Sequence, residues 1–291
     1  MGTIKISNVS KKYGDTFALD NISLTIEENK IYGLLGRNGA GKTTLLNVIN
    51  NRIFIDGGVI SIDDKDLSQD KKGLGNIYFM TEQNLYPQSM KIKELFNWTS
   101  EFYPSFDMEY ALELSKKFGL NINKRIKELS TGYSSICKII NTMASNADIL
   151  MFDEPVLGLD ANHREMFYSE LMESYIEKPK TIILSTHIIE EVAKILEKIV
   201  ILKDGKIIND ENVEELLNKC YCVSGLNKNI DDYIKDKNCI SVDVMSSFKS
   251  AVIMGENGDM EKEEMKKLDL EISKVELQKL FIHLTSEGGI K

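Results

Sequence analysis

IYGLLGRNGAGKT, residues 31–43, is the stretch that decides the fold. Its first part, Ile31–Leu35, is a nearly continuous apolar run, which is typical of a strand buried on both faces of a parallel sheet. Its second part, Gly36–Thr43, fits the pattern G-x-x-x-x-G-K-[ST]. Residues Lys42–Ile49 then have helical composition. Strand, glycine-rich loop and helix together are the setting that a phosphate-binding loop requires.

The residue types in this loop suit a polyphosphate. Glycines let the backbone curl so that several N–H groups point at one anion, and the positive end of the helix beginning near Gly41 adds to the attraction. Lys42 can reach the β- and γ-phosphates of a nucleotide, and the Thr43 hydroxyl can ligate Mg²⁺. The alternative is a structural glycine turn. The predicted nucleotide contacts here are Gly36, Asn38, Gly39, Ala40, Gly41, Lys42, Thr43 and Thr44.

Two acids follow a second apolar run. Asp153 and Glu154 come directly after Ile149–Phe152, so both are expected at the end of a buried strand. A carboxylate there can hold Mg²⁺, which predicts Asp153 as a metal ligand. Glu154 would face the γ-phosphate and accept a proton from attacking water. Paired acids at a strand end are a weak signal alone and a strong one beside a phosphate loop.

Composition narrows the classes of function. The 291 residues carry 36 basic and 45 acidic side chains, a formal net charge of -9, which argues against nucleic acid as the main partner. The four cysteines show no metal-ligand spacing and are expected to be reduced. The chain begins without a secretion signal, and its apolar runs are far shorter than the roughly 20 residues of a membrane span. We expect a cytoplasmic protein.

The fold class predicted from these patterns is α/β. Ile4–Val9 and Ile22–Ile26 alternate apolar and polar residues as half-buried strands do. Strand composition returns at Ile149–Phe152 and Thr181–Ser185 with a helical stretch between them, which indicates a parallel sheet. Residues of about 84–147 are predicted to form a helical subdomain. Its aromatic residues between Tyr86 and Tyr110 can be read either as core or as a groove for a partner.

Further motifs follow the same order along the chain as those of a known family. Tyr13 lies in KKYGD, Gln83 in MTEQN, and Leu129–Tyr133 reads LSTGY. Asp153-Glu154-Pro155 is followed by Gly158-Leu159-Asp160, and Ser185-Thr186-His187 comes last. Over about residues 1–210 the sequence therefore resembles the nucleotide-binding subunits of ABC transporters, although each motif alone has a plain structural explanation.

The resemblance implies an ATPase core at 1–210, in which an N-terminal antiparallel β subdomain accompanies the parallel sheet and the helical subdomain. A small α+β extension at 211–291 would be regulatory or dimerising. The resemblance also implies roles for particular side chains. Tyr13 would stack on adenine, Gln83 would contact Mg²⁺, and His187 would act with Glu154 and Lys42 in catalysis. Ser130 and Gly132 would meet the nucleotide bound by a second subunit, and Asp160 would be a further nucleotide contact.

LSTGY departs from LSGGQ, the commonest form of the family's signature, at two positions. Thr131 replaces a glycine and Tyr133 replaces glutamine, while Ser130 and Gly132 remain. Catalysis is expected to survive, and the effects on dimer affinity and on asymmetry between subunits stay open. Signatures with threonine at this position occur in a branch of small exporters, and in this respect the sequence resembles that branch.

The resemblance implies ATP and Mg²⁺ as cofactors and two protein partners. A second ATPase subunit, identical or paralogous, would pack head to tail around two ATP molecules. A separate transmembrane permease would hold the chain at the inner face of the cell membrane. We expect export of amphipathic peptides, antimicrobial peptides or drugs. The alternatives are an importer ATPase, a soluble ATPase of the same type, a small-molecule kinase and a regulatory module without turnover.

Overall fold

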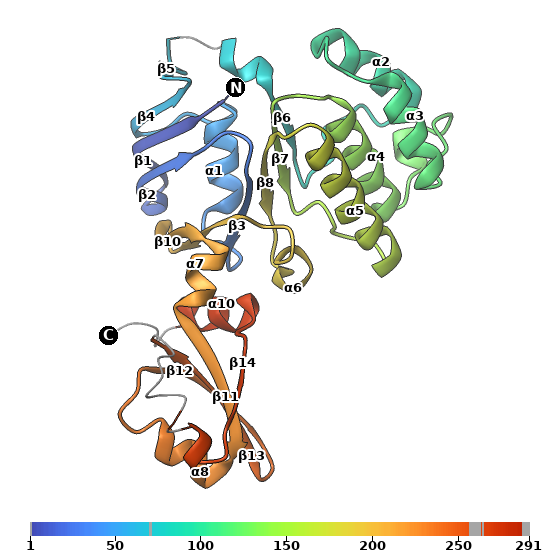
Figure 1. Cartoon of the computed structure of the whole chain (residues 1–291). Coiled ribbons are helices and arrows are strands. Elements are labelled where there is room, and N and C mark those ends of the chain that lie inside the picture. Colours follow the sequence, from blue (N-terminus) through green and yellow to red (C-terminus); the bar gives the residue numbers. More distant parts are fainter. Residues whose placement is uncertain (1, 70–71, 256–262, 264, 287–291) are drawn as a thin grey trace. The chain divides into compact units, whose positions relative to one another are not determined.

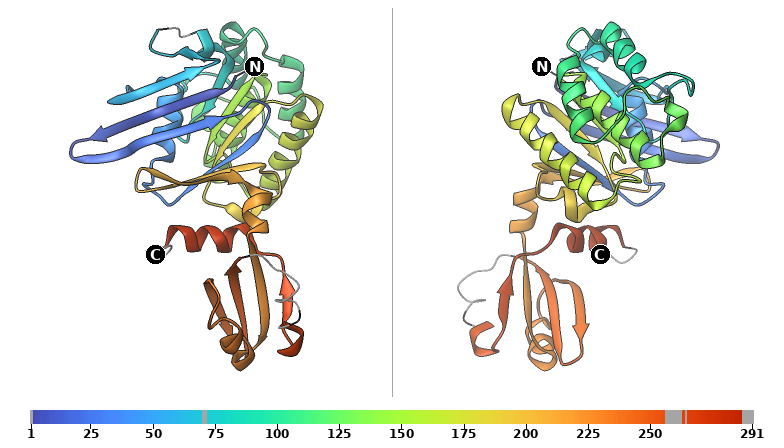
Figure 2. Two further views of the ribbon diagram at one scale, coloured as in Figure 1. Left: turned by 60° about the vertical axis from the view of Figure 1, so that its left-hand side comes forward. Right: turned by 90° about the vertical axis from the view of Figure 1, so that its right-hand side faces the viewer.

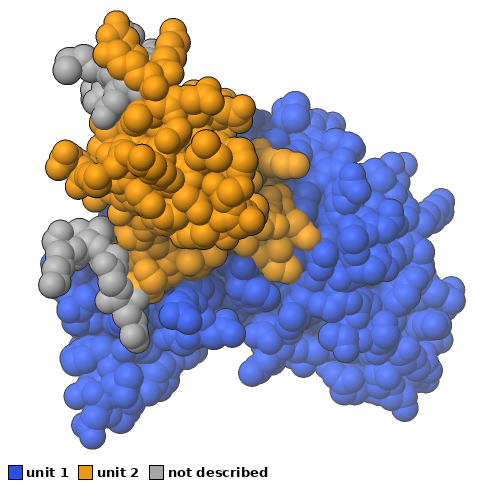
Figure 3. Space-filling view, turned by 90° about the horizontal axis from the view of Figure 1, so that it is seen from below, with its two compact units in different colours: residues 1–187, 200–207 blue, residues 188–199, 208–291 orange. Residues whose placement is uncertain are grey.

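The computed structural model describes residues 2–69, 72–255, 263 and 265–286. They form two compact units (Figure 3), Met1–His187 with Val200–Ile207 and Ile188–Ile199 with Ile208–Lys291. The second unit thus includes a segment, Ile188–Ile199, that lies before the predicted boundary at residue 210. No helix in the described part of the chain is both long and apolar enough to cross a bilayer.

A six-stranded sheet in the order β10-β9-β3-β8-β7-β6 organises the first unit (Figure 1). β3, β8, β7 and β6 run parallel to one another, and every residue of these four strands is buried. The division between the two units falls inside β9 and β10. The strand bounds are β3 (Ile31–Gly36), β6 (Ile77–Met80), β7 (Ile149–Asp153), β8 (Thr181–Ser185), β9 (Lys198–Lys203) and β10 (Lys206–Asn212).

The parallel arrangement explains how distant motifs meet. The carboxyl ends of parallel strands lie at the same edge of a sheet, and ligands of open α/β sheets bind outside that edge. β3 ends at Gly36, β7 at Asp153, β8 at Ser185 and β6 at Met80. The glycine loop, the paired acids, His187 and the segment after Met80 therefore all leave the sheet on one side.

A second, antiparallel sheet has the order β2-β1-β4-β5, and its long β1–β2 hairpin is clear in Figure 2. Helix α1 lies between the two sheets, because Leu45, Leu46 and Ile49 belong to the same apolar core as Ile4 and Met151. This confirms the predicted strands at the N-terminus and the helix after the loop. The bounds are β1 (Ile4–Tyr13), β2 (Thr16–Ile26), α1 (Lys42–Ile49), β4 (Gly57–Ile62), β5 (Lys65–Asp66) and the short 3-10 helix η1 (Lys72–Asn76).

Helices dominate the segment between β6 and β7, as predicted (Figure 1). Its aromatic residues divide between the two readings left open by the sequence. Phe96 is fully buried in the core, whereas Trp98 is 52% exposed and Phe102 is 75% exposed. The Tyr103 hydroxyl donates to the carbonyl of Ile77 at 2.8 Å. The bounds are α2 (Ile92–Phe102), α3 (Met108–Lys117), η2 (Ile126–Glu128), α4 (Thr131–Ala144) and α5 (Ala161–Glu177), the last following β7.

The second unit contains a four-stranded antiparallel sheet of order β12-β13-β11-β14 (Figure 2). Its small core packs Tyr221 and Val223 of β11 against Ile230 and Tyr233, and the two tyrosine hydroxyls lie 3.1 Å apart. The bounds are α6 (Ile189–Val192), α7 (Val213–Asn218), β11 (Cys220–Leu226), α8 (Asn227–Tyr233), β12 (Cys239–Met245), β13 (Phe248–Met254), β14 (Glu271–Ser273) and α10 (Leu277–Thr285).

Candidate functional site

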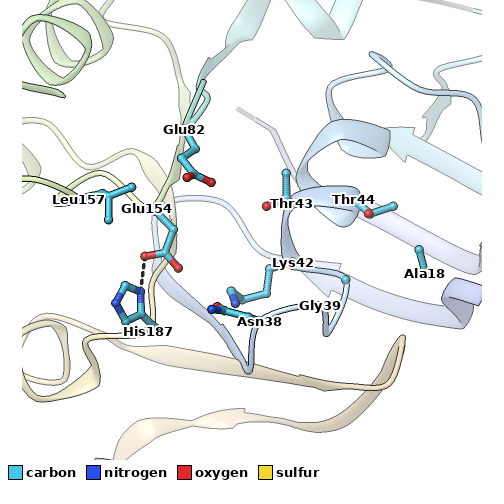
Figure 4. A pocket seen from close by; sticks show the side chains of 11 residues that line it. Ala18, Asn38, Gly39, Lys42, Thr43, Thr44, Glu82, Glu154, Leu157 and His187 are labelled. Carbon is cyan, nitrogen blue, oxygen red and sulfur yellow. Dashed lines mark hydrogen bonds and ion pairs between the residues drawn. The ribbon is translucent and has the colours of Figure 1, made fainter. Parts of the chain in front are cut away.

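A cavity of about 390 Å³ opens at the sheet edge where the glycine loop and the strand-end acids emerge. Figure 4 shows two facing walls. The phosphate-loop wall is formed by the loop and the start of α1, and the strand-end wall carries Glu154, His187 and Glu82. The lining residues are Ala18, Asn38, Gly39, Gly41, Lys42, Thr43, Thr44, Glu82, Glu154, Leu157 and His187.

Two glycines of the loop are required by geometry. Gly41 has φ 108°, and a Cβ there would lie 2.4 Å from the carbonyl oxygen of Ala18. Gly36 is confined by a different neighbour, since its Cβ would lie 2.7 Å from the Leu202 carbonyl oxygen. A side chain at either position would displace the backbone. Gly36 and Ala40 thus shape the loop from behind without lining the cavity.

Lys42 is the cation of the phosphate-loop wall. Its side chain is 7% exposed, and its ammonium donates to the carbonyl of Gly36 at 2.7 Å. Burial lowers the pKa of Lys42, and the negative charges of Glu154 and Asp153 oppose that shift. The ammonium is therefore held by the loop's own backbone at the head of the cavity, where a phosphate oxygen could take the place of the carbonyl.

Asp153 is a buried acid at the end of β7. The residue is 1% exposed, and neither carboxylate oxygen has a hydrogen-bond partner among the described residues. Burial raises the pKa of Asp153, while the nearby hydroxyls of Thr43 and Ser185 oppose part of the shift. A buried carboxylate needs a compensating charge or donor. Two orphaned oxygens beside a threonine hydroxyl fit the oxygen-ligand preference of Mg²⁺.

Glu154 and His187 form an acid–imidazole pair on the strand-end wall. The Glu154 Oε2 lies 2.8 Å from the His187 Nδ1, and the dashed line in Figure 4 marks this contact. Glu154 has φ 48°, a left-handed conformation that costs a residue with a side chain on the order of 1–3 kcal/mol. Its N–H donates to the Ser185 carbonyl at 2.9 Å, so the neighbouring strand β8 holds it in place.

The segment after β6 places Glu82, and not the predicted Gln83, in the lining of the cavity. Glu82 lines the cavity, and its carboxylate points into the space between the two walls (Figure 4). Gln83 lines a separate pocket of about 190 Å³ with Arg52 and Tyr103. The reason is a local turn after β6, in which the Thr81 hydroxyl donates to the Gln83 carbonyl at 2.9 Å. In the sequence, Glu82 is marked only by being the acid next to Gln83 in MTEQN.

The signature residues do not line the phosphate-loop cavity. Ser130 caps α4 by accepting from the Tyr133 N–H at 3.3 Å and lines another cavity of about 400 Å³, which also contains Glu82 and Glu154. A Cβ on Gly132 would lie 2.7 Å from the Gly158 carbonyl oxygen, so the glycine is required inside this chain. Within one subunit, the loop and Ser130 therefore line two adjacent cavities that share Glu82, Glu154 and Leu157.

The two remaining predicted contacts also lie outside the cavity lining. Tyr13 ends β1 with its side chain 53% exposed, and the Lys11 ammonium is 5.6 Å from its ring centroid. Asp160 caps α5 by accepting from the His163 N–H at 2.9 Å. Besides Glu82, two lining residues were not predicted from the sequence: Ala18, which lies beside the loop, and Leu157, in the turn before Asp160. An alanine and a leucine carry no sequence signal of nucleotide binding, so neither could be predicted.

Comparison with known proteins agrees with this geometry. The family model for ABC transporter matches residues 19–157. The ABC transporter ATP-binding protein YtrB of Bacillus subtilis is 32% identical over 213 residues, 73% of each chain. The lantibiotic transport ATP-binding protein SrtF of Streptococcus pyogenes is 32% identical over 229 residues, 74% of this chain and 96% of SrtF.

A relative named for import and a solved structure extend the comparison. The ribose import ATP-binding protein RbsA of Lactococcus lactis is 28% identical over 253 residues, and the match covers 81% of this chain and 50% of RbsA. The dimeric structure of a bacterial ABC transporter cassette superposes with a TM-score of 0.64 at 28% identity, over 72% of this chain and 98% of that one. With the phosphate loop and its facing acids in place, the chain belongs to the ATP-binding, ATP-hydrolysing proteins of ABC transporters.

Proposed function

We propose that this chain hydrolyses ATP at the phosphate-loop cavity to power a separate membrane permease that exports amphipathic peptides, antimicrobial peptides or drugs. One observation carries the hydrolytic part of the proposal: Lys42 and the Glu154–His187 pair line the same cavity from opposite walls. Phosphoryl transfer to water needs charge neutralisation on one side and an oriented water on the other. The two walls supply one requirement each.

The phosphate-loop wall would bind the nucleotide. The N–H groups from Asn38 to Thr44 and the first turn of α1 would surround the phosphates, and the Lys42 ammonium would move from the Gly36 carbonyl to a phosphate oxygen. Tyr13, half exposed at the end of β1, would stack on adenine. Gly36 and Ala40 contribute by fixing the backbone that presents these groups.

Thr43 and Asp153 are the residues that would hold Mg²⁺, because the Asp153 oxygens are buried and unpartnered. When bound, the metal supplies charge neutralisation at the β- and γ-phosphates. Asp153 is the last residue of β7, and Thr43 lies in the first turn of α1. This chain therefore brings the two ligands together through packing of that helix on the sheet.

Glu154 would accept the proton of the attacking water, and His187 would orient Glu154 and the γ-phosphate. The 2.8 Å contact between their side chains prepares this arrangement before nucleotide arrives. A general base contributes about 10²–10⁴ in rate. The strained backbone of Glu154 is the kind of feature that accumulates at functional positions.

The active assembly would be a head-to-tail dimer, identical or paralogous, in which the signature of one subunit completes the site of the other. The support is that Ser130 does not line the phosphate-loop cavity of its own chain, and that the related cassette compared above has a dimeric structure. Ser130, Gly132 and Asp160 would then approach the nucleotide of the partner. Sedimentation of the Glu154→Gln variant should show an ATP-dependent dimer, whereas a strictly monomeric variant with ATP would contradict the arrangement.

A permease would place the chain at the inner face of the membrane. The pocket lined by Gln83, Tyr86 and Tyr103, with Trp98 and Phe102 exposed on α2, is the surface we assign to it. The proposal of export is supported by the match to the lantibiotic transport protein, which spans 96% of that protein. A relative named for import is also among the matches, so the direction of transport has to be measured.

Transport in membrane vesicles tests this proposal. Inverted vesicles that carry the permease and this chain should accumulate a labelled amphipathic cationic peptide when Mg²⁺ and ATP are added outside. Vesicles with Glu154→Gln should accumulate none and serve as the matched control. ATP-dependent accumulation of ribose instead of peptide, or no difference between the two chains, would contradict the proposed export.

A further inference from the structure

A row of polar side chains runs along one face of α4, the helix that Ser130 caps. Ser134, Lys138 and Asn141 are spaced by four and three residues, which places them on the same face of a helix. All three bond to the end of β6 and the turn that follows it. The contacts are Asn84 Nδ2 to Ser134 Oγ at 3.2 Å, Lys138 Nζ to the carbonyls of Thr81 at 3.0 Å and Glu82 at 2.6 Å, and Asn141 Nδ2 to Tyr78 Oη at 2.5 Å.

Lys138 is the charged member of this row, and it is buried. Its side chain is 6% exposed, and burial lowers the pKa of its ammonium while the charge of Glu82 opposes the shift. A buried ammonium is stable only where it is paired or hydrogen-bonded. Its two carbonyl partners belong to consecutive residues, Thr81 and Glu82, so the lysine fixes the backbone from which the Glu82 side chain projects.

Lys138 also separates two spaces. On one side it lines the cavity that contains Ser130, Glu82 and Glu154. On the other side it lines the small pocket with Gln83 and Tyr86. The backbone of the 81–83 turn runs between these spaces, and it turns the Glu82 carboxylate towards the phosphate loop and Gln83 away from it.

We propose that Lys138 is a positioning residue, which holds the Glu82 carboxylate in the phosphate-loop cavity as a second acid beside Asp153 at the predicted cation site. Mg²⁺ in nucleotide sites is bound by one or two carboxylates together with phosphate oxygens. The inference rests on the proposed Mg²⁺ and ATP site and adds two residues to it, Glu82 as a contributor of charge and Lys138 acting through Glu82.

A double-mutant cycle on Mg²⁺ dependence tests the inference. The full chain is titrated with Mg²⁺ while binding of a fluorescent ATP analogue is followed, so the readout does not require hydrolysis. Glu82→Gln removes the charge and Lys138→Met removes the ammonium with little change of volume. Each should raise the Mg²⁺ concentration for half-maximal binding by about tenfold, which corresponds to 1.4 kcal/mol.

The double variant decides how the two residues act. If Lys138 acts through Glu82, Lys138→Met should add little to the shift already caused by Glu82→Gln. Lys180→Met is the matched control, because Lys180 is also 6% exposed and donates to the Asn146 carboxamide at 2.8 Å without lining the phosphate-loop cavity. Its Mg²⁺ midpoint should equal that of the wild type.

Three outcomes would overturn the inference. The first is an unchanged Mg²⁺ midpoint in Glu82→Gln, which is decisive even if Lys138→Met fails to fold, since Glu82 is exposed and its replacement leaves the core intact. The second is a shift of the Mg²⁺ midpoint in the double variant that equals the product of the fold-changes in the two single variants. The third is an equal shift in Lys180→Met. A wild-type chain that binds no nucleotide with Mg²⁺ would instead overturn the proposed function itself.

Discussion

The two walls of the phosphate-loop cavity are built in different ways. The phosphate-loop wall comes from consecutive residues, 36–44, and its shape depends on backbone conformation at glycines such as Gly41. The strand-end wall is assembled from segments that follow β6, β7 and β8, and its residues Glu82 and His187 are more than 100 positions apart in the sequence. The loop presents N–H groups and an ammonium, whereas the strand ends present carboxylates and an imidazole. The first composition suits binding of phosphates and the second suits chemistry on water.

The largest effect is expected from breaking the backbone of the phosphate-loop wall. Gly41→Ala must place a Cβ 2.4 Å from the Ala18 carbonyl oxygen at φ 108°, so the loop has to move. We expect nucleotide binding to be lost and the free energy of unfolding to fall by several kcal/mol, since strain alone costs about 1–3 kcal/mol. Urea denaturation and binding of a fluorescent ATP analogue measure both effects.

Gly14→Ala provides the control for Gly41→Ala. Gly14 also has a positive φ, 58°, but a Cβ there would meet no atom within 4 Å. Its cost should be limited to roughly 1–2 kcal/mol of backbone strain, with nucleotide binding preserved. Equal losses in the two variants would show that strain, and not the shape of the loop, accounts for the effect.

A smaller effect is expected from removing the charge of the phosphate-loop wall. Lys42→Ala deletes the ammonium that now contacts the Gly36 carbonyl and leaves the loop glycines in place. A hydrogen bond to a charged group contributes about 1.5–3 kcal/mol, so affinity for ATP should fall by about 10- to 100-fold. Fluorescence titration gives the dissociation constant. Unchanged affinity would contradict the assignment of Lys42 to the phosphates.

On the strand-end wall, His187→Ala should separate turnover from binding. The imidazole contacts Glu154 at 2.8 Å but is largely exposed, so its loss should change stability by less than about 0.5 kcal/mol. We expect kcat to fall roughly tenfold or more, the equivalent of about 1.4 kcal/mol in the barrier, while affinity for ATP is retained. Steady-state ATPase kinetics beside His283→Ala, a histidine of the second unit, checks this split.

The same contrast explains what the sequence could and could not predict. The phosphate-loop wall is local, so the motif at Gly36–Thr43 and the buried strand before it were sufficient to place Lys42 and Thr43. Asp153 and Glu154 were predicted from their position after the apolar run Ile149–Phe152, and His187 from the family's motif order. That Glu82 lines this cavity while Gln83 lines another pocket could not be predicted, because it depends on a turn and on the buried Lys138, neither of which has a sequence pattern.

In the second unit, the types of secondary structure could be predicted from the sequence, but their packing could not. Its α+β character was predicted, and the antiparallel strands β12 and β13 are part of it. Its small core around Tyr221 and Tyr233 was not predicted, because it depends on which face of the sheet α8 covers. The inclusion of residues 188–199 in this unit likewise follows from packing and not from any change in composition.

The central claim is that one wall binds ATP and the other hydrolyses it, and Glu154→Gln tests it most directly. The substitution keeps the size of the side chain and removes the base. Measured on the same preparation, binding of the fluorescent ATP analogue should match the wild type, and turnover should fall by about 10²-fold or more. Near-normal hydrolysis by Glu154→Gln, or a loss of binding equal to that of Lys42→Ala, would contradict the account.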